Sequence, residues 1–295
     1  MPGSVGAGRR GPRFLAIGRS CKADWASRCH HRVNGRLRLG ALGAMACCVL
    51  PSLVSKMTQF SSPRTKSAFY LGPSMSGFST ARQKMVDGQV RPSDVADIRI
   101  IDAMLAVPRE AFVPQNQRAL AYLDLDLDVS EGGTVKRFLI KPAVTAKMVQ
   151  AADIKDADEV LVVGCASGYL AALVARLARR VTATESDPSL AAKAKAAFAE
   201  LGLGNVSVKT AAMAEGDSAN APFDVIVLNG ATEIAPEALC RQLKEGGRLV
   251  GAFAMTKPQR AMIVTRSHGD FGYRALFDTV IPVLPGLEQP PAFVF

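Results

Sequence analysis

Residues 160–169 read Val-Leu-Val-Val-Gly-Cys-Ala-Ser-Gly-Tyr, and this stretch decides the fold. Its first four residues are apolar, which is typical of a strand buried on both faces of a parallel sheet. Gly164 and Gly168 predict a tight turn, and an apolar face that begins at Leu170 predicts a helix after it. A strand, a glycine turn and a helix in this order are typical of a doubly wound sheet that binds a nucleotide-like ligand at the turn.

Strands and helices continue to alternate downstream of this unit. A strand over 181–184 brings Glu185 to its carboxyl end, and Asp187 with Pro188 predicts the start of a helix. We expect strands over 206–208, over 224–228 and from Arg248 onward. Asn229-Gly230 follows the strand over 224–228, and a helix through Leu239 and Leu243 precedes the strand that starts at Arg248. Segments 261–265, 275–280 and 293–295 predict antiparallel edge strands. The predicted class is therefore α/β, with a doubly wound, mostly parallel, Rossmann-like sheet.

The region before the glycine turn predicts helices and a loop. Polar and apolar residues over 78–90 indicate a helix, and Asp94 is a good N-cap for a second one, which has Ile98, Ile101, Met104 and Leu105 on one face. Residues 122–129 alternate as in a half-buried strand or an extended loop. Asp124, Asp126 and Asp128 resemble the start of a calcium loop, but Val129 and Val135 stand where Gly and Glu are needed, so no metal is predicted.

The charge is concentrated in the first quarter of the chain. Residues 1–74 hold 12 of the 36 Lys and Arg and one of the 26 acidic residues, so residues 75–295 carry 24 basic and 25 acidic residues. The high overall charge therefore does not predict nucleic-acid binding by the rest of the chain. We divide the chain into a basic, disordered leader or misplaced start (1–74), a helical and substrate-loop region (75–150) and a cofactor-binding α/β domain (151–295).

Three functional readings of the leader remain open beside a true start at Met75. The apolar run 41–54 resembles the core of an export signal, the excess of arginine resembles a transit peptide, and Cys21, Cys29, His30 and His31 lack the paired spacing of a zinc site. No apolar run is long enough to span a bilayer, so no membrane association is predicted. Unpaired cysteines, among them Cys165 and Cys240, and the weak export signal predict a cytoplasmic protein.

The residues around the turn predict a cofactor site. Glu185 follows Gly164 by 21 residues, the separation at which an acid reaches ribose hydroxyls. The second glycine of a dinucleotide motif is missing, so NAD is the weaker choice, and the spacing suits S-adenosylmethionine, which has no phosphate. The expected cofactor-binding residues are Gly164, Cys165, Ala166, Ser167, Gly168, Tyr169, Glu185, Ser186, Asn229 and Gly230.

Residues 75–295 resemble the L-isoaspartyl (D-aspartyl) protein O-methyltransferases. The resemblance rests on 160–169 and on Pro108-Arg-Glu-Ala-Phe-Val-Pro114, Asn205-Val206, Pro222-Phe-Asp-Val-Ile226 and Leu243-Lys-Glu-Gly-Gly-Arg-Leu-Val250. It implies transfer of a methyl group from S-adenosylmethionine to a carboxylate of a protein or peptide that contains isoaspartyl residues. The ester then forms a succinimide, which permits protein repair. A carboxylate is already ionised at neutral pH, so the reaction needs no catalytic acid–base pair, and no catalytic residue is predicted.

The sequence departs from the family pattern at several positions. Val162 replaces an acid, Ala166 replaces the central glycine, and residues 210–213 lack the acid that the family has near the adenine. The family's substrate loop is approximately Gln-Thr-Ile-Ser-Gln-Pro, where this chain has Arg137-Phe-Leu-Ile-Lys-Pro142, so Ile140 replaces the serine. Arg137 or Lys141 either binds an acidic group or is a solvated surface charge. The alternative to an active enzyme is a non-catalytic, cofactor-binding or regulatory relative.

Overall fold

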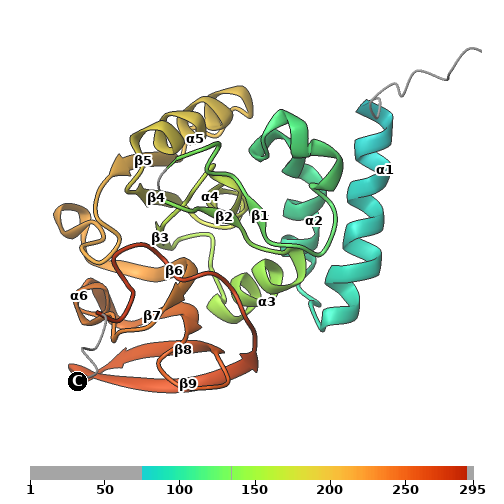
Figure 1. Cartoon of the computed structure of the whole chain (residues 1–295). Coiled ribbons are helices and arrows are strands. Elements are labelled where there is room, and N and C mark those ends of the chain that lie inside the picture. The colour runs from blue at the N-terminus through green and yellow to red at the C-terminus, as the bar shows by residue number, and fades with distance from the viewer. Residues whose placement is uncertain (1–74, 134, 291–295) are drawn as a thin grey trace, which may run out of the picture. The chain divides into compact units, whose positions relative to one another are not determined.

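The computed structural model describes residues 75–290 except Thr134 (Figure 1). The predictions for the leader, for a metal site at Cys21, Cys29, His30 and His31, and for a strand over 293–295 lie outside the described residues.

A seven-stranded sheet organises the described part of the chain. Its strand order is β5-β4-β3-β6-β7-β8-β9 (Figure 1). The strands are β3 (Glu159–Val163), β4 (Arg180–Glu185), β5 (Val206–Thr210), β6 (Phe223–Thr232), β7 (Leu243–Phe253), β8 (Arg260–Ser267) and β9 (Asp270–Asp278). Strands β5, β4, β3, β6 and β7 pair in parallel, whereas β8 pairs antiparallel with β7 and β9 pairs antiparallel with β8 at the edge. The predicted doubly wound sheet with antiparallel edge strands is confirmed.

Helices cover both faces of this sheet. They are α1 (Met75–Met85), α2 (Ile98–Ala106), α3 (Pro142–Ala152), α4 (Tyr169–Ala175), α5 (Pro188–Glu200) and α6 (Glu237–Cys240). Val160 and Val162 of β3 belong to the core that includes residues of α1 to α5, whereas Leu161 and Val163 belong to the core that includes α6. All four side chains are fully buried. An uninterrupted apolar run is therefore needed here, as the sequence predicted.

The N-terminal helices differ in detail from their prediction. The helix expected over 78–90 is present as α1 and a π-helical turn, η1 (Val86–Val90), followed by η2 (Arg91–Ser93). Asp94 is not the cap of α2, because its φ of 63° places it in the left-handed region; Asp97 accepts the Arg99 N–H instead, at 2.9 Å. Ile98 is 69% exposed, whereas Ile101 and Met104 on the same predicted face are buried.

Short elements connect α2 to α3. They are η3 (Arg109–Phe112), η4 (Gln115–Leu120), β1 (Leu127–Asp128) and β2 (Phe138–Leu139). Only two residues of the alternating segment 122–129 form a strand, and residues 122–125 form turns and bends in which Leu123 and Leu125 are about half exposed. Helix α3, which begins at Pro142, was not predicted.

Two element boundaries near the site were predicted wrongly. Strand β6 continues through Asn229 and Gly230 instead of ending before them. The helix expected through Leu239 and Leu243 ends at Cys240, and Leu243 already belongs to β7, where it pairs with Phe223. The four-residue spacing of two leucines resembles a helix face, but here one leucine faces the core from a helix and the other from a strand.

Two further findings on the described residues concern membrane-spanning helices and clusters of metal-binding side chains. Over 75–290, without Thr134, there is no helix long and apolar enough to cross a membrane. In the same part of the chain, no group of three or more His, Cys, Asp or Glu side chains is placed to hold a metal ion. His268 lies exposed in the turn between β8 and β9.

Candidate functional site

The carboxyl ends of β3, β4 and β6 meet at one place in the sheet. Val163 of β3 pairs with Thr184 of β4 on one side and with Leu228 of β6 on the other. The next residues along the three strands are Gly164, Glu185 and Asn229. Ligands of doubly wound folds bind at this end of the strands, so the fold brings the predicted cofactor residues together.

Glu185 is the best-connected side chain of this site. It is fully buried and accepts hydrogen bonds from the backbone N–H groups of Ala166 (2.6 Å), Ser186 (2.9 Å) and Asp187 (3.3 Å). Arg137 also donates to it, through Nε at 3.2 and 3.3 Å and through Nη2 at 3.2 Å. The carboxylate is therefore compensated by a cation and by the backbone of the turn, as a buried charge requires.

The glycine turn is held by backbone and side-chain contacts. The N–H groups of Gly164 and Cys165 both donate to the Thr184 carbonyl at 2.9 Å. The Gly164 carbonyl accepts from Asn229 Nδ2 at 2.8 Å and from Arg137 Nη2 at 2.7 Å. Gly164 has a φ of 71°, and a Cβ there would lie 2.7 Å from both Arg137 Nη2 and Leu284 Cδ2. Glycine is required at this position for its backbone angle and for space.

The other residues of the turn face different surroundings. Ala166 replaces glycine with a φ of 50°, and Gly168 has a φ of 104° with Phe198 2.8 Å from its Cβ position. Burial raises the pKa of the Cys165 thiol, and the charge of Glu185 raises it further, so this thiol is unreactive. The Ser167 hydroxyl is buried and has no hydrogen-bond partner among the described residues.

Tyr169 points away from the site. Its ring packs edge-on against Phe112 with centroids 5.7 Å apart, and Arg109 Cζ lies 4.7 Å above it. Tyr169 is thus part of the core between α4 and η3. The predicted contact of Tyr169 with a cofactor would therefore involve its backbone and not its side chain.

Arg137 lies in a small antiparallel ladder. Leu127 pairs with Leu139 and Asp128 with Phe138, and the Arg137 N–H donates to Ser130 Oγ at 2.7 Å. This ladder directs the Arg137 side chain toward Glu185 and Gly164, where the side chain is 3% exposed. The interpretation of Arg137 as a solvated surface charge is therefore wrong.

The remaining substrate-loop residues lie in and beside α3. Ile140 is buried, and its carbonyl accepts from Arg109 Nη2 at 2.7 Å. The Lys141 N–H donates to Asp126 Oδ1 at 2.8 Å and its side chain is partly exposed, while Pro142 is the buried first residue of α3. The Ile140 side chain is thus part of the core and not of an open surface.

Three further residues of this region were not predicted. Arg109 is fully buried, and its Nε donates to the Ala121 carbonyl at 2.7 Å while its Nη2 holds the Ile140 carbonyl. Burial lowers the pKa of this guanidinium. Leu284 and Met213 fill space beside Gly164. Arg109 lies in the motif at 108–114, which could have indicated it. Leu284 and Met213 come from distant segments, and no local sequence pattern indicates their contact with Gly164.

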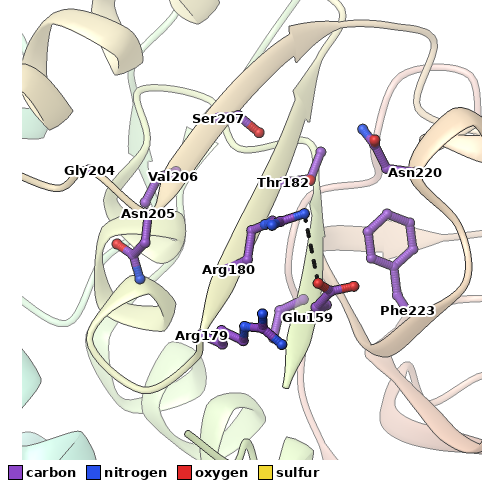
Figure 2. A pocket seen from close by; sticks show the side chains of 11 residues that line it. Glu159, Arg179, Arg180, Thr182, Gly204, Asn205, Val206, Ser207, Asn220 and Phe223 are labelled. Carbon is purple, nitrogen blue, oxygen red and sulfur yellow. Dashed lines mark ion pairs between the residues drawn. The ribbon is translucent and has the colours of Figure 1, made fainter. Parts of the chain in front are cut away.

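A cavity of about 400 Å³ lies at the opposite end of the strands (Figure 2). Figure 2 shows the ion pair of Glu159 and Arg180 in this cavity, with Asn205 and Asn220 at different places in its lining. Glu159 and Arg180 are the first residues of β3 and β4. This cavity contains none of the predicted site residues and lies at the amino ends of the strands, where doubly wound folds do not place their cofactor.

Comparisons with known proteins agree with the fold and the motifs. A family model for protein-L-isoaspartate(D-aspartate) O-methyltransferase matches residues 80–283. A protein-L-isoaspartate O-methyltransferase of Koribacter versatilis is 37% identical over 221 residues, which are 75% of this chain and 98% of the relative. Protein-L-isoaspartate O-methyltransferase 1 of Rhodopseudomonas palustris (strain HaA2) is 39% identical over 65% of this chain and 78% of its own.

Solved structures support the fold. One named protein-L-isoaspartate O-methyltransferase superposes with a TM-score of 0.64 at 24% identity and covers 70% of this chain and 67% of its own. A Plasmodium falciparum structure is described as such a putative methyltransferase in complex with S-adenosyl-L-homocysteine. It superposes with a TM-score of 0.59 at 18% identity, and the match covers 70% of this chain and 97% of that chain.

Proposed function

Because the chain belongs to the protein-L-isoaspartate(D-aspartate) O-methyltransferase family, we propose that it transfers a methyl group from S-adenosylmethionine to the carboxylate of isoaspartyl residues in proteins or peptides. The observation that carries this proposal is the meeting of Gly164, Glu185 and Asn229 at the carboxyl ends of three parallel strands.

The donor and acceptor groups of the site fit this cofactor. The Glu185 carboxylate at the end of β4 would accept hydrogen bonds from ribose hydroxyls, and the positive φ of Gly164 brings backbone close to the ligand. Asn229 holds the Gly164 carbonyl and so fixes the turn. Cys165, Ala166, Ser167, Gly168, Tyr169, Ser186 and Gly230 complete the proposed cofactor contacts.

The reaction asks little of the side chains. When bound, S-adenosylmethionine supplies a methyl group on a sulfonium, which is a good leaving group. That methyl group would go to an oxygen of the already ionised substrate carboxylate, so no residue of this chain would need to move a proton. The protein has to align the two partners and exclude water. Buried apolar side chains such as Ile140 and Leu284 keep the surroundings dry.

The proposed substrate is a protein or peptide, approached through the loop that contains Arg137, Ile140, Lys141 and Pro142. We infer no role for nucleic acids or membranes, because the excess of basic residues falls on 1–74 and not on the catalytic part of the chain. Free thiols at Cys165 and Cys240 fit a reducing, cytoplasmic location.

A labelled-methyl assay tests the proposal. The full chain should methylate an isoaspartyl peptide and leave unmodified the same peptide with normal aspartate. Glu185→Gln should lower the rate strongly, because the amide donates where the carboxylate accepts, whereas Glu215→Gln, which changes an exposed acid, should not. Absence of methyl transfer by the folded protein would contradict the proposal and favour the non-catalytic relative.

A further inference from the structure

The Glu185 carboxylate already has a full set of donors. Three backbone N–H groups and the Arg137 guanidinium surround its two oxygens. Because a carboxylate has about four lone-pair positions, two further hydroxyl donors cannot bind without displacing some of these groups. The backbone donors belong to the turn itself and to the start of α5, so Arg137 is the donor that can leave by rotation of a side chain.

The same guanidinium occupies the approach to the glycine turn. Arg137 Nη2 donates to the Gly164 carbonyl at 2.7 Å and lies 2.7 Å from the Cβ position of Gly164. Leu284 Cδ2 lies at the same distance from that position, and Leu284 is also 2.7 Å from the Cβ position of Gly230. The face of the turn that a ligand would approach is thus covered by two side chains of this chain.

We propose that Arg137 acts as an internal latch, which competes with the cofactor ribose for Glu185 and reduces the affinity for S-adenosylmethionine. The proposal rests on the proposed cofactor site. The latched state cannot bind the cofactor. The apparent affinity is therefore the intrinsic affinity multiplied by the fraction of molecules in which Arg137 has left Glu185. Arg137 therefore sets the cofactor concentration at which the enzyme works.

The arrangement allows release without loss of the fold. When Arg137 leaves, Glu185 keeps its three backbone N–H donors, so the buried carboxylate is not left without partners. Glutamine is shorter than arginine and neutral, and its amide can still donate a hydrogen bond. Arg137→Gln is therefore the variant expected to open the site with the least disturbance.

Calorimetric titration with S-adenosylhomocysteine tests the latch. We expect measurable binding by the full chain, and binding at least about tenfold tighter by Arg137→Gln and by Arg137→Ala. The alanine variant excludes a new contact from glutamine. Lys136→Gln removes the same charge from the adjacent residue, which is 62% exposed and pairs with Asp128, and should leave the affinity unchanged.

The outcomes separate the latch from the proposed function. Equal affinity of the wild type and the Arg137 variants would overturn the latch and leave the function intact. Absence of binding by all folded proteins would overturn both. If the variants do not fold, the wild-type protein is labelled with phenylglyoxal, which modifies accessible arginines. Arg137 should be protected from labelling in the absence of ligand and should become reactive in the presence of saturating S-adenosylhomocysteine. Equal labelling of Arg137 under both conditions would overturn the latch.

Discussion

Arg137 and Glu185 lie 48 residues apart in the sequence and form a buried ion pair, with Nη2 and Oε2 separated by 3.2 Å. The side chains are 3% and 0% exposed. The pair connects the ladder before α3 to the end of β4. It therefore links the proposed substrate loop to the proposed cofactor site.

A double-mutant cycle measures this link. Glu185→Gln should lower the free energy of unfolding by about 3–5 kcal/mol, because it leaves a buried guanidinium without its counter-charge. The combined Arg137→Gln, Glu185→Gln variant should lose less than the sum of the single variants, by about 0.5–3 kcal/mol in urea denaturation. Additive losses would show that the two side chains do not interact.

The two left-handed positions of the turn should respond differently to substitution. Gly164→Ala should lower the free energy of unfolding by at least about 1–3 kcal/mol, because of its φ of 71° and the crowded Cβ position. Thermal denaturation of the purified variants measures this change.

Ala166→Gly is the matched control for Gly164→Ala. Relief of the left-handed conformation gains about 1–2 kcal/mol. Loss of a buried methyl costs about 0.8 kcal/mol, and the more flexible unfolded chain costs about 0.4–1 kcal/mol. We therefore expect a change smaller than about 1 kcal/mol. A Gly164→Ala protein as stable as the wild type would contradict the described turn.

The cap of α5 gives a prediction about pH. Hydrogen bonds from Ser189, side chain and backbone, hold the pKa of the Asp187 carboxyl below its usual value. A lowered pKa stabilises the fold above the ordinary aspartate pKa of about 3.9, and this contribution is lost as the pH falls through the folded value. Asp187→Ala should cost about 1 kcal/mol at neutral pH.

That cost should shrink in urea denaturations performed below about pH 4. Asp187→Asn, which keeps a capping oxygen, should lose less than the alanine variant at neutral pH. A cost of the alanine substitution that stays constant down to pH 3 would contradict a role for the ionised carboxylate.

Arg109 should be a structural requirement of the substrate loop. Arg109→Met removes the donors to the buried carbonyls of Ala121 and Ile140, which should cost at least about 2 kcal/mol. Arg118→Met, at an exposed position, should change the stability by less than about 0.5 kcal/mol in the same denaturant titration. Equal effects of the two substitutions would contradict the assigned contacts of Arg109.

Local patterns predicted the elements that local interactions determine. The apolar run of β3, the delivery of Glu185 by β4 and the Asp187 cap of α5 all follow from short sequence signals. The boundaries of β6 and α6 were wrong, because Leu243 is drawn into β7 by its pairing with Phe223, which a helix-like spacing does not reveal.

The contacts across the site were not predictable in the same way. Arg137 has a surface-like sequence context between polar and apolar residues, and only the tertiary fold shows that its partner is Glu185. Leu284 reaches Gly164 and Gly230 from a segment more than fifty residues beyond either glycine. Such contacts depend on the packing of distant segments, and one sequence contains no local signal for them.

The most direct test of the account is transfer of a labelled methyl group from S-adenosylmethionine to an isoaspartyl peptide, measured for the full chain and for Arg137→Gln across a range of cofactor concentrations. We predict methylation by both, with a KM for S-adenosylmethionine that is lower in the variant and a similar rate at saturation. A protein that binds S-adenosylhomocysteine but methylates the isoaspartyl peptide no faster than the normal aspartyl peptide would contradict the proposed function.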